Sequence, residues 1–246
     1  MPDAWSPRAV LCVPTYNEIE NLEPLVRALE NVIDPARDLV IVIDDDSPDG
    51  TGARADVLAE SIPWLTVLHR SRKEGIGAAY LAAFRVALAT GAELVLQMDC
   101  DFSHDPADVP RLIRAIDEGA DLALGSRWVP GGGTVNWGLA RRLISRGGSL
   151  YARRVLGVRV RDLTGGFKCF RRRVLETVDL AAVTTRGYGF QIEVTYRTLR
   201  KGLTVVELPI TFVDRRVGQS KMSTAIVLEA MGQVPALRLR ALLGRL

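Results

Sequence analysis

The sequence has few cysteines, and their spacing does not suggest pairing. Cys12, Cys100 and Cys169 are odd in number and far apart, with no C-x-x-C spacing among them. This argues against a disulfide framework or a zinc site and fits a reducing cytoplasm. The chain also lacks a run of about 18 apolar residues and a recognisable signal peptide. We therefore expect no segment of it to span a bilayer.

The loop after the first predicted strand lacks the two glycine motifs that commonly bind nucleotide phosphates. Neither G-x-G-x-x-G nor G-K-[ST] occurs there. This lowers the expectation of an ordinary dinucleotide-binding fold or a P-loop. With 246 residues, 48% of them apolar, the chain can still bury a sizeable core, as one domain or one domain with an appendage.

Positive charge is concentrated in one part of the chain. The net charge is only +3, but residues 131–173 contain 11 Lys and Arg against one acid, Asp162. Such a segment favours an anionic partner: lipid headgroups, a phosphorylated substrate or nucleic acid. Aromatic side chains for base stacking are sparse in it, which disfavours nucleic acid. The alternative is a solvated helix face, because exposed arginine is common.

Short apolar runs alternate with helical patterns in the first half of the chain. Strands are predicted at 9–13, 39–43, 65–69, 94–98 and 122–125. This alternation predicts βαβ units and a mainly parallel sheet flanked by helices. Asn17 and Glu20 have the spacing of a capping box for the first helix.

The pattern changes after Ser126. We expect a basic helix at 139–156, a strand at 167–170, a helix at 189–199 and an edge strand at 203–213 that tolerates Pro209. Residues 223–246 predict an amphipathic helix that lies on a membrane surface or docks on the core or on a partner. The expected organisation is a domain over 1–222 and this C-terminal helix over 223–246.

Three acidic loops follow predicted strands, at Glu18, at 44–46 and at Asp99 and Asp101. The carboxyl ends of parallel strands lie at one edge of a sheet, so these loops should meet in one crevice. Alternate residues of an extended segment point the same way, so Asp99 and Asp101 can hold one hard cation that also binds substrate phosphates. The alternative is that Asp101 and Asp105 serve only as a turn residue and a helix cap.

These loops belong to a larger set of motifs. V-P-T-Y-N-E at 13–18, D-D-D-S-P-D-G-T at 44–51 and D-C-D at 99–101 resemble the nucleotide-sugar half of an inverting family-2 glycosyltransferase with the GT-A fold. The remaining motifs resemble the dolichol-phosphate (polyprenol-phosphate) mannose synthases specifically: G-S-R at 125–127, N-W at 136–137 with Arg141, D-L-T-G-G-F at 162–167, F-Q-I-E at 190–193, and V-D-R-R at 213–216 with Gly218, Ser220 and Lys221.

The resemblance implies a role for each matching residue. It assigns the guanosine part of GDP-mannose to Pro14, Tyr16, Glu18, Ile43 and Asp45, and it brings the backbone of Cys100 close to the nucleotide. It makes Asp99, Asp101 and Ser103 ligands of Mg²⁺ or Mn²⁺, although some relatives have Gln at the position of Ser103. His104 either supports this site or is a neutral residue at a helix start.

The resemblance also implies a group of cations that face phosphates: Arg127, Arg141, Arg215 and Lys221. Arginine matches phosphate oxygens bidentately, whereas lysine supplies a mobile point charge. Asp101, Arg127, Arg215 and Lys221 would carry the chemistry, and Lys221, in a loop with Gly218, would close over the bound donor. The implied reaction is direct displacement at the anomeric carbon of mannose by a lipid phosphate, with inversion.

The implied acceptor, polyprenyl or dolichyl phosphate, is insoluble in water. We therefore expect a cytoplasmic protein that is peripheral on the inner face of the membrane, where the segment 141–173 meets anionic lipid. A membrane-anchoring protein partner is a further expectation, and nucleic acid is not an expected partner.

Three other interpretations remain. The same fold could use another sugar or acceptor, as in a polyprenyl-phosphate glucosyltransferase or a transferase acting on a glycan hydroxyl. A phosphatase of the haloacid-dehalogenase type also places Asp-x-Asp after a buried strand, with the first aspartate as nucleophile. A non-catalytic protein could bind membranes or nucleic acid through its basic segment.

Overall fold

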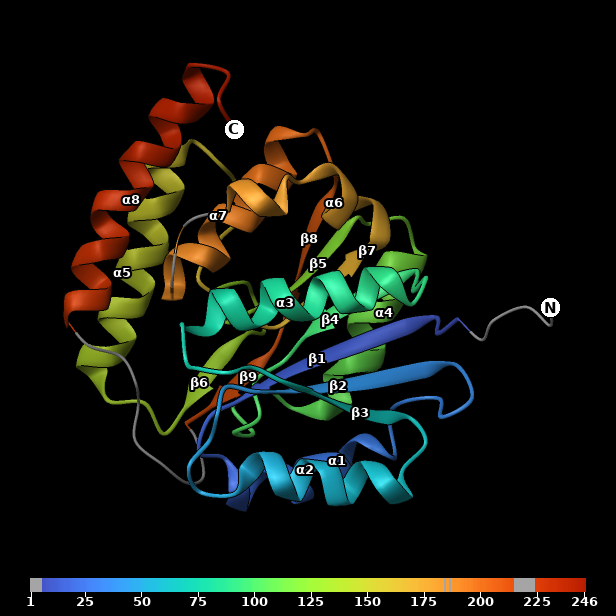
Figure 1. Ribbon diagram of the computed structural model, residues 1–246. Helices are drawn as coiled ribbons and strands as arrows, with labels where there is room; N and C mark the ends of the chain where they lie inside the picture. Colours follow the sequence, from blue (N-terminus) through green and yellow to red (C-terminus); the bar gives the residue numbers. More distant parts are fainter. Residues whose placement is uncertain (1–5, 184, 186, 215–223) are drawn as a thin grey trace.

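The computed structural model describes residues 6–183, 185, 187–214 and 224–246. Its centre is a seven-stranded sheet with the order β3-β2-β1-β4-β7-β5-β8 (Figure 1). Within this sheet β7 runs antiparallel to both of its neighbours, and the other pairs are parallel. The strands are β1 (Ala9–Thr15), β2 (Asp38–Asp44), β3 (Leu65–His69), β4 (Leu94–Gln97), β5 (Leu122–Ser126), β7 (Lys168–Arg171) and β8 (Val205–Pro209). The prediction of a mainly parallel sheet is confirmed.

Helices cover both faces of the sheet because successive strand residues point to opposite faces. In β1, Leu11 and Val13 pack in a cluster with α1 (Ile19–Leu29), α2 (Thr51–Ser61) and α4 (Val109–Asp117). Val10 and Cys12 pack on the opposite face with α3 (Ile76–Ala89), α6 (Arg172–Thr177) and α7 (Gly187–Arg200). Two short 3₁₀ helices are Pro106–Asp108 and Leu180–Ala182.

A third cluster joins the C-terminal helix to the rest of the protein. α8 (Thr224–Leu242) lies beside α5 (Leu139–Leu156), as the red and olive helices of Figure 1 show. Val234 and Leu237 of α8 pack with Leu156 of α5 and Tyr196 of α7. Because Tyr151 also donates a hydrogen bond to the carbonyl of Met231 at 2.9 Å, the expected amphipathic helix is docked on the protein.

The segment predicted as one edge strand over 203–213 forms two strands instead. β8 is the edge strand of the main sheet, and β9 (Thr211–Val213) pairs in parallel with β6 (Gly133–Val135). At Ile210 the backbone changes partners, because its N–H bonds Ser126 while its carbonyl accepts from Gly133. None of the described helices combines the length and hydropathy needed to cross a bilayer.

Candidate functional site

Three acidic loops meet at one edge of the sheet. β1 pairs with β2 and with β4 in parallel, so all three strands end on the same side. Thr15, the last residue of β1, is opposite Asp44, and its carbonyl accepts from Asp45 N at 3.2 Å. The predicted convergence of the loops is therefore confirmed.

The first two loops are joined by hydrogen bonds. Backbone N–H groups of Asn17 and Ile19 donate to Ser47 Oγ at 3.1 Å and to Asp49 Oδ2 at 3.2 Å. Helix α1 is thus capped by the neighbouring loop. Glu18 is its N-cap residue without a side-chain cap bond, so the predicted capping box was wrong.

Basic residues after β3 contact the acidic loops. Arg70 donates to Asp45 Oδ1 at 2.5 Å, and Lys73 Nζ lies 3.7 Å from the centre of the Tyr16 ring. Burial raises the pKa of Asp45, and the Arg70 guanidinium offsets only part of this rise. Sequence reasoning missed both cations. The signal was present, since R-S-R-K at 70–73 follows β3, a strand that ends at the same edge.

The other residues assigned to the nucleotide lie around the same loops. Glu18 accepts a hydrogen bond from Asn21 Nδ2 at 2.8 Å. Pro14 is half-buried and pairs in register with Ile43, which is completely buried below α3. Their contacts with a nucleoside stay predictions.

A tight turn after β4 arranges the paired aspartates. Ser103 N donates to Asp101 Oδ1 at 3.1 Å, and Tyr80 OH donates to Asp99 Oδ1 at 3.4 Å. The turn depends on Phe102 at φ 59°, a left-handed conformation that is rare for an aromatic residue and commonly found where function requires it. Cys100, between the two aspartates, is buried and packs in the hydrophobic core.

His104 holds this turn as a neutral side chain. Its Nδ1 accepts a hydrogen bond from Asp99 N at 3.2 Å, and its ring stacks on Phe167 at 4.9 Å between centroids. Burial lowers the pKa of His104 to about 4. The ring therefore supports the turn as a neutral imidazole, the form expected for a histidine at a helix start.

The residues of this turn fit a hard divalent cation. Ser103 Oγ is buried and has no hydrogen-bond partner among the described residues, so it is available as an oxygen ligand. The described part of the chain contains no cluster of three His, Cys, Asp or Glu that could enclose a metal. Mg²⁺, however, typically takes one or two carboxylates and completes its coordination with substrate phosphates and water.

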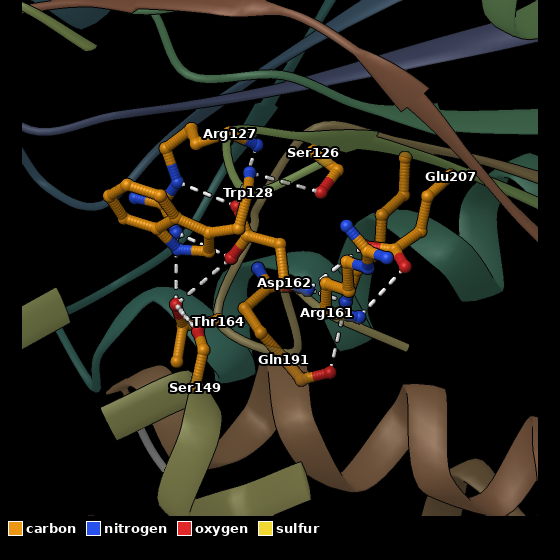
Figure 2. A network of polar contacts seen from close by, with 10 residues as sticks. Ser126, Arg127, Trp128, Ser149, Arg161, Asp162, Thr164, Gln191 and Glu207 are labelled. Atoms are coloured by element: carbon orange, nitrogen blue, oxygen red, sulfur yellow. Dashed lines mark hydrogen bonds and ion pairs between the residues drawn. The ribbon is translucent and has the colours of Figure 1, made fainter. Parts of the chain in front are cut away.

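Two of the predicted phosphate-facing arginines, Arg127 and Arg141, take part in ion pairs. Arg127 Nε and Nη2 donate to the two carboxylate oxygens of Asp162, both at 2.7 Å, and Nη2 also donates to Thr164 Oγ1 (Figure 2). Burial would raise the pKa of Asp162, but Arg127 more than offsets this and the pKa is lowered. Glu207 of β8 fixes the same loop by accepting from the backbone N–H of Arg161 and Asp162.

Arg141 pairs with Asp214 at 2.6 Å and lies over the Trp137 ring. The chain leading to Asp214 reaches the aspartate turn, because Val213 N donates to Ser103 O at 3.2 Å. Arg215 and Lys221 lie outside the described residues. The phosphate contacts of all four cations stay predictions.

A basic cavity of about 490 Å³ opens next to Arg127. Arg142, Arg146 and Arg161 also line it, and its lining contains no acid. These three arginines form no ion pair with any described residue. The cavity can therefore accept an anionic group.

The mainly parallel sheet and the acidic loops at its edge define a protein of the GT-A class, the fold of many glycosyltransferases. Residues 10–179 match the family "Glycosyl transferase family 2", and the chain belongs to this family. It is 48% identical to an undecaprenyl-phosphate mannosyltransferase of Micrococcus luteus, over 92% of both chains. It is 46% identical to a polyprenol monophosphomannose synthase of Mycolicibacterium smegmatis, over 97% of this chain and 89% of the relative.

The similarity extends to a more distant protein and to solved structures. A dolichol-phosphate mannosyltransferase of Pyrococcus furiosus is 36% identical over 90% of this chain and 61% of its own length. The fold resembles that of Mycobacterium tuberculosis glucosyl-3-phosphoglycerate synthase, solved with Mn²⁺, UDP and glucosyl-3-phosphoglycerate, with a TM-score of 0.64 and 21% identity. That match covers 97% of this chain and 80% of the other.

Proposed function

We propose that this protein transfers mannose from GDP-mannose to a polyprenyl phosphate with inversion, giving polyprenyl-phosphate β-mannose and GDP. The observation that carries the proposal is the relationship, at 46–48% identity over about nine tenths of each chain, to proteins named for this class of reaction. The meeting of three acidic loops with buried Asp101 and Ser103 supports it independently.

Asp99, Asp101 and Ser103 would hold Mg²⁺ or Mn²⁺ at the donor diphosphate. When bound, such a cation neutralises negative charge on the departing nucleotide. The carboxylates of Glu18 and Asp45 are suited to accept hydrogen bonds from ribose hydroxyls or from base N–H groups. Tyr16, held by Lys73, would add a flat apolar surface for the base.

The acceptor explains the lack of an obvious general base. A sugar hydroxyl must lose a proton as it attacks, whereas a phosphate monoester is already anionic at pH 7. The chain contains two histidines: His104 is buried in the aspartate turn, and His69 bonds Asp56 at 2.9 Å. Placement of the acceptor phosphate by Arg127, Arg141, Arg215 and Lys221 is then the main task.

The exposed face of α5 supports placement at a membrane surface. Leu139 and Leu143 are 75% and 71% exposed, and Arg142 and Arg146 follow at positions that share their helix face. Near an anionic leaflet each arginine contributes about 1 kcal/mol, while the leucines enter the interface. We infer that α5 and the basic cavity rest on anionic headgroups of the cytoplasmic leaflet, with or without an anchoring protein.

The decisive test is incubation with radiolabelled GDP-mannose, polyprenyl phosphate and Mg²⁺, followed by organic extraction of labelled lipid. A parallel panel contains UDP-glucose and soluble glycan acceptors. Of the nucleotide sugars tested, we expect only GDP-mannose to give labelled lipid. The Asp101→Ala variant should give nearly none. Faster turnover of another sugar or of a glycan hydroxyl would overturn the substrate assignment.

Membrane placement has its own test. Co-sedimentation with vesicles containing anionic lipid should weaken at high salt and in an Arg142→Gln/Arg146→Gln variant. Binding that is the same at low and high salt would contradict the electrostatic contribution.

A further inference from the structure

A chain of buried polar side chains runs behind the aspartate turn. Lys168 of β7, whose side chain is fully buried, donates from Nζ to Gln191 O at 2.9 Å and to Gln191 Oε1 at 2.7 Å. Gln97, the last residue of β4, donates from Nε2 to the same Oε1 at 3.2 Å. Burying a lysine without a carboxylate partner is costly, so this arrangement calls for an explanation beyond packing.

These contacts fix the orientation of the Gln191 carboxamide. Both of its partners are donors, since Lys168 has only N–H groups and Gln97 approaches with its nitrogen. The atom they share must therefore be the oxygen of Gln191, and the Nε2 group lies on the other side. No described residue accepts a hydrogen bond from this Nε2.

The Nε2 group faces the space in front of Gly166. A Cβ atom placed on Gly166 would lie 3.6 Å from Gln191 Nε2, 3.8 Å from His104 Cε1 and 4.0 Å from Asp99 Oδ2. Glycine thus leaves open a spot that the amide shares with the aspartate turn. The three distances are ordinary van der Waals contacts, so a methyl group there would meet no clash within the protein.

We propose that Gln191 binds the sugar of the nucleotide donor by donating from Nε2 to a sugar hydroxyl, and that Lys168 and Gln97 are positioning residues that hold its carboxamide in this orientation. A neutral N–H donor suits a hydroxyl, while the phosphates require cations. The sugar follows the diphosphate in the donor, so it lies beside whichever residues hold that diphosphate. This inference rests on the proposed function, because it assumes that Asp99 and Asp101 hold the diphosphate.

The test compares the affinity for GDP with the affinity for GDP-mannose, in Mg²⁺ and without acceptor. Gln191→Leu should weaken GDP-mannose binding about tenfold, as expected for one hydrogen bond with a buried group, and leave GDP binding unchanged. Lys168→Met should shift the same ratio in the same direction, because the amide loses its orientation. A matched control is Thr198→Val, which removes a buried hydrogen bond to Val194 O on the same helix and should leave the ratio unchanged.

Gly166→Ala provides a second route if substitutions at the buried chain prevent folding. We expect this variant to fold and to bind GDP-mannose more weakly while its affinity for GDP is unchanged, because the added methyl group occupies the space proposed for the sugar. The inference would be overturned if the substitutions weakened GDP and GDP-mannose binding equally, or if a folded Gln191→Leu protein bound both as wild type does. In either case, mannosyl transfer by the wild-type protein would leave the proposed function intact. Wild-type protein that transfers no sugar from any nucleotide donor would overturn both.

Discussion

The buried pair between Arg127 and Asp162 gives a quantitative prediction about stability. Asp162 has no exposed surface, and it accepts three hydrogen bonds from Arg127, one from the backbone and two from the guanidinium. Asp162→Asn keeps the size of the side chain but removes its charge. The Arg127 side chain, only 6% exposed, then loses the counter-charge of Asp162.

Breaking one side of a buried ion pair typically costs about 3–5 kcal/mol, because the remaining charge stays desolvated. We expect Asp162→Asn to lower the free energy of unfolding by that amount, since both guanidinium bonds are short and charge-assisted. Urea denaturation followed by circular dichroism measures this directly. The change should appear in the midpoint, with little change in the slope.

A double-mutant cycle separates the pair from general disruption of the loop. Arg127→Met should also destabilise the protein, and Arg127→Met/Asp162→Asn should lose clearly less than the two single losses together. A loss below about 1 kcal/mol for Asp162→Asn, or additive losses, would show that the pair is not a buried unit.

Further predictions concern pH, packing and thiols. Because the folded pKa of Asp162 is lowered, its stabilisation is present above the ordinary carboxyl value of about 4 and is lost as the pH falls through the folded value; the unfolding midpoint of Asp162→Asn should depend less on pH there. Gly52→Ala places a Cβ atom 2.7 Å from buried Asp44 Oδ2 and should cost about 1–3 kcal/mol, whereas Gly147→Ala on α5 meets no atom within 4 Å and should be neutral or stabilising. The cysteines are buried, and burial raises the pKa of the Cys12 and Cys169 thiols, so thiol reagents should label them only after unfolding; rapid labelling of native protein would contradict this.

The elements of the fold that depend on a local sequence pattern could be predicted from the sequence. Apolar runs followed by acidic loops predicted β1, β2 and β4 and the edge at which they meet, because parallel strands have a fixed polarity. The direction of β7 did not follow from its pattern, since the sequence of a four-residue strand does not encode whether it pairs in parallel or antiparallel. The separation of β9 from β8 also depends on a tertiary change of backbone partners at Ile210.

The candidate site shows the same division. Asp99 and Asp101 were predicted from one contiguous stretch, whereas Ser103 was added by the family resemblance. The pairing of Arg127 with Asp162 joins residues 35 positions apart, and no local spacing encodes it. Gln191 was visible only as part of a motif, because the orientation of its carboxamide depends on Lys168 of β7 and Gln97 of β4.

GDP binding with and without a divalent cation tests the central claim most directly. In calorimetric titrations, wild-type protein should bind GDP at least about tenfold more tightly with excess Mg²⁺ than with excess EDTA, a difference of about 1.4 kcal/mol. Asp101→Asn should bind as weakly in Mg²⁺ as wild type does in EDTA. Equal wild-type affinities in the two buffers would contradict the assignment of the carboxylates after β4 to a metal that holds the nucleotide.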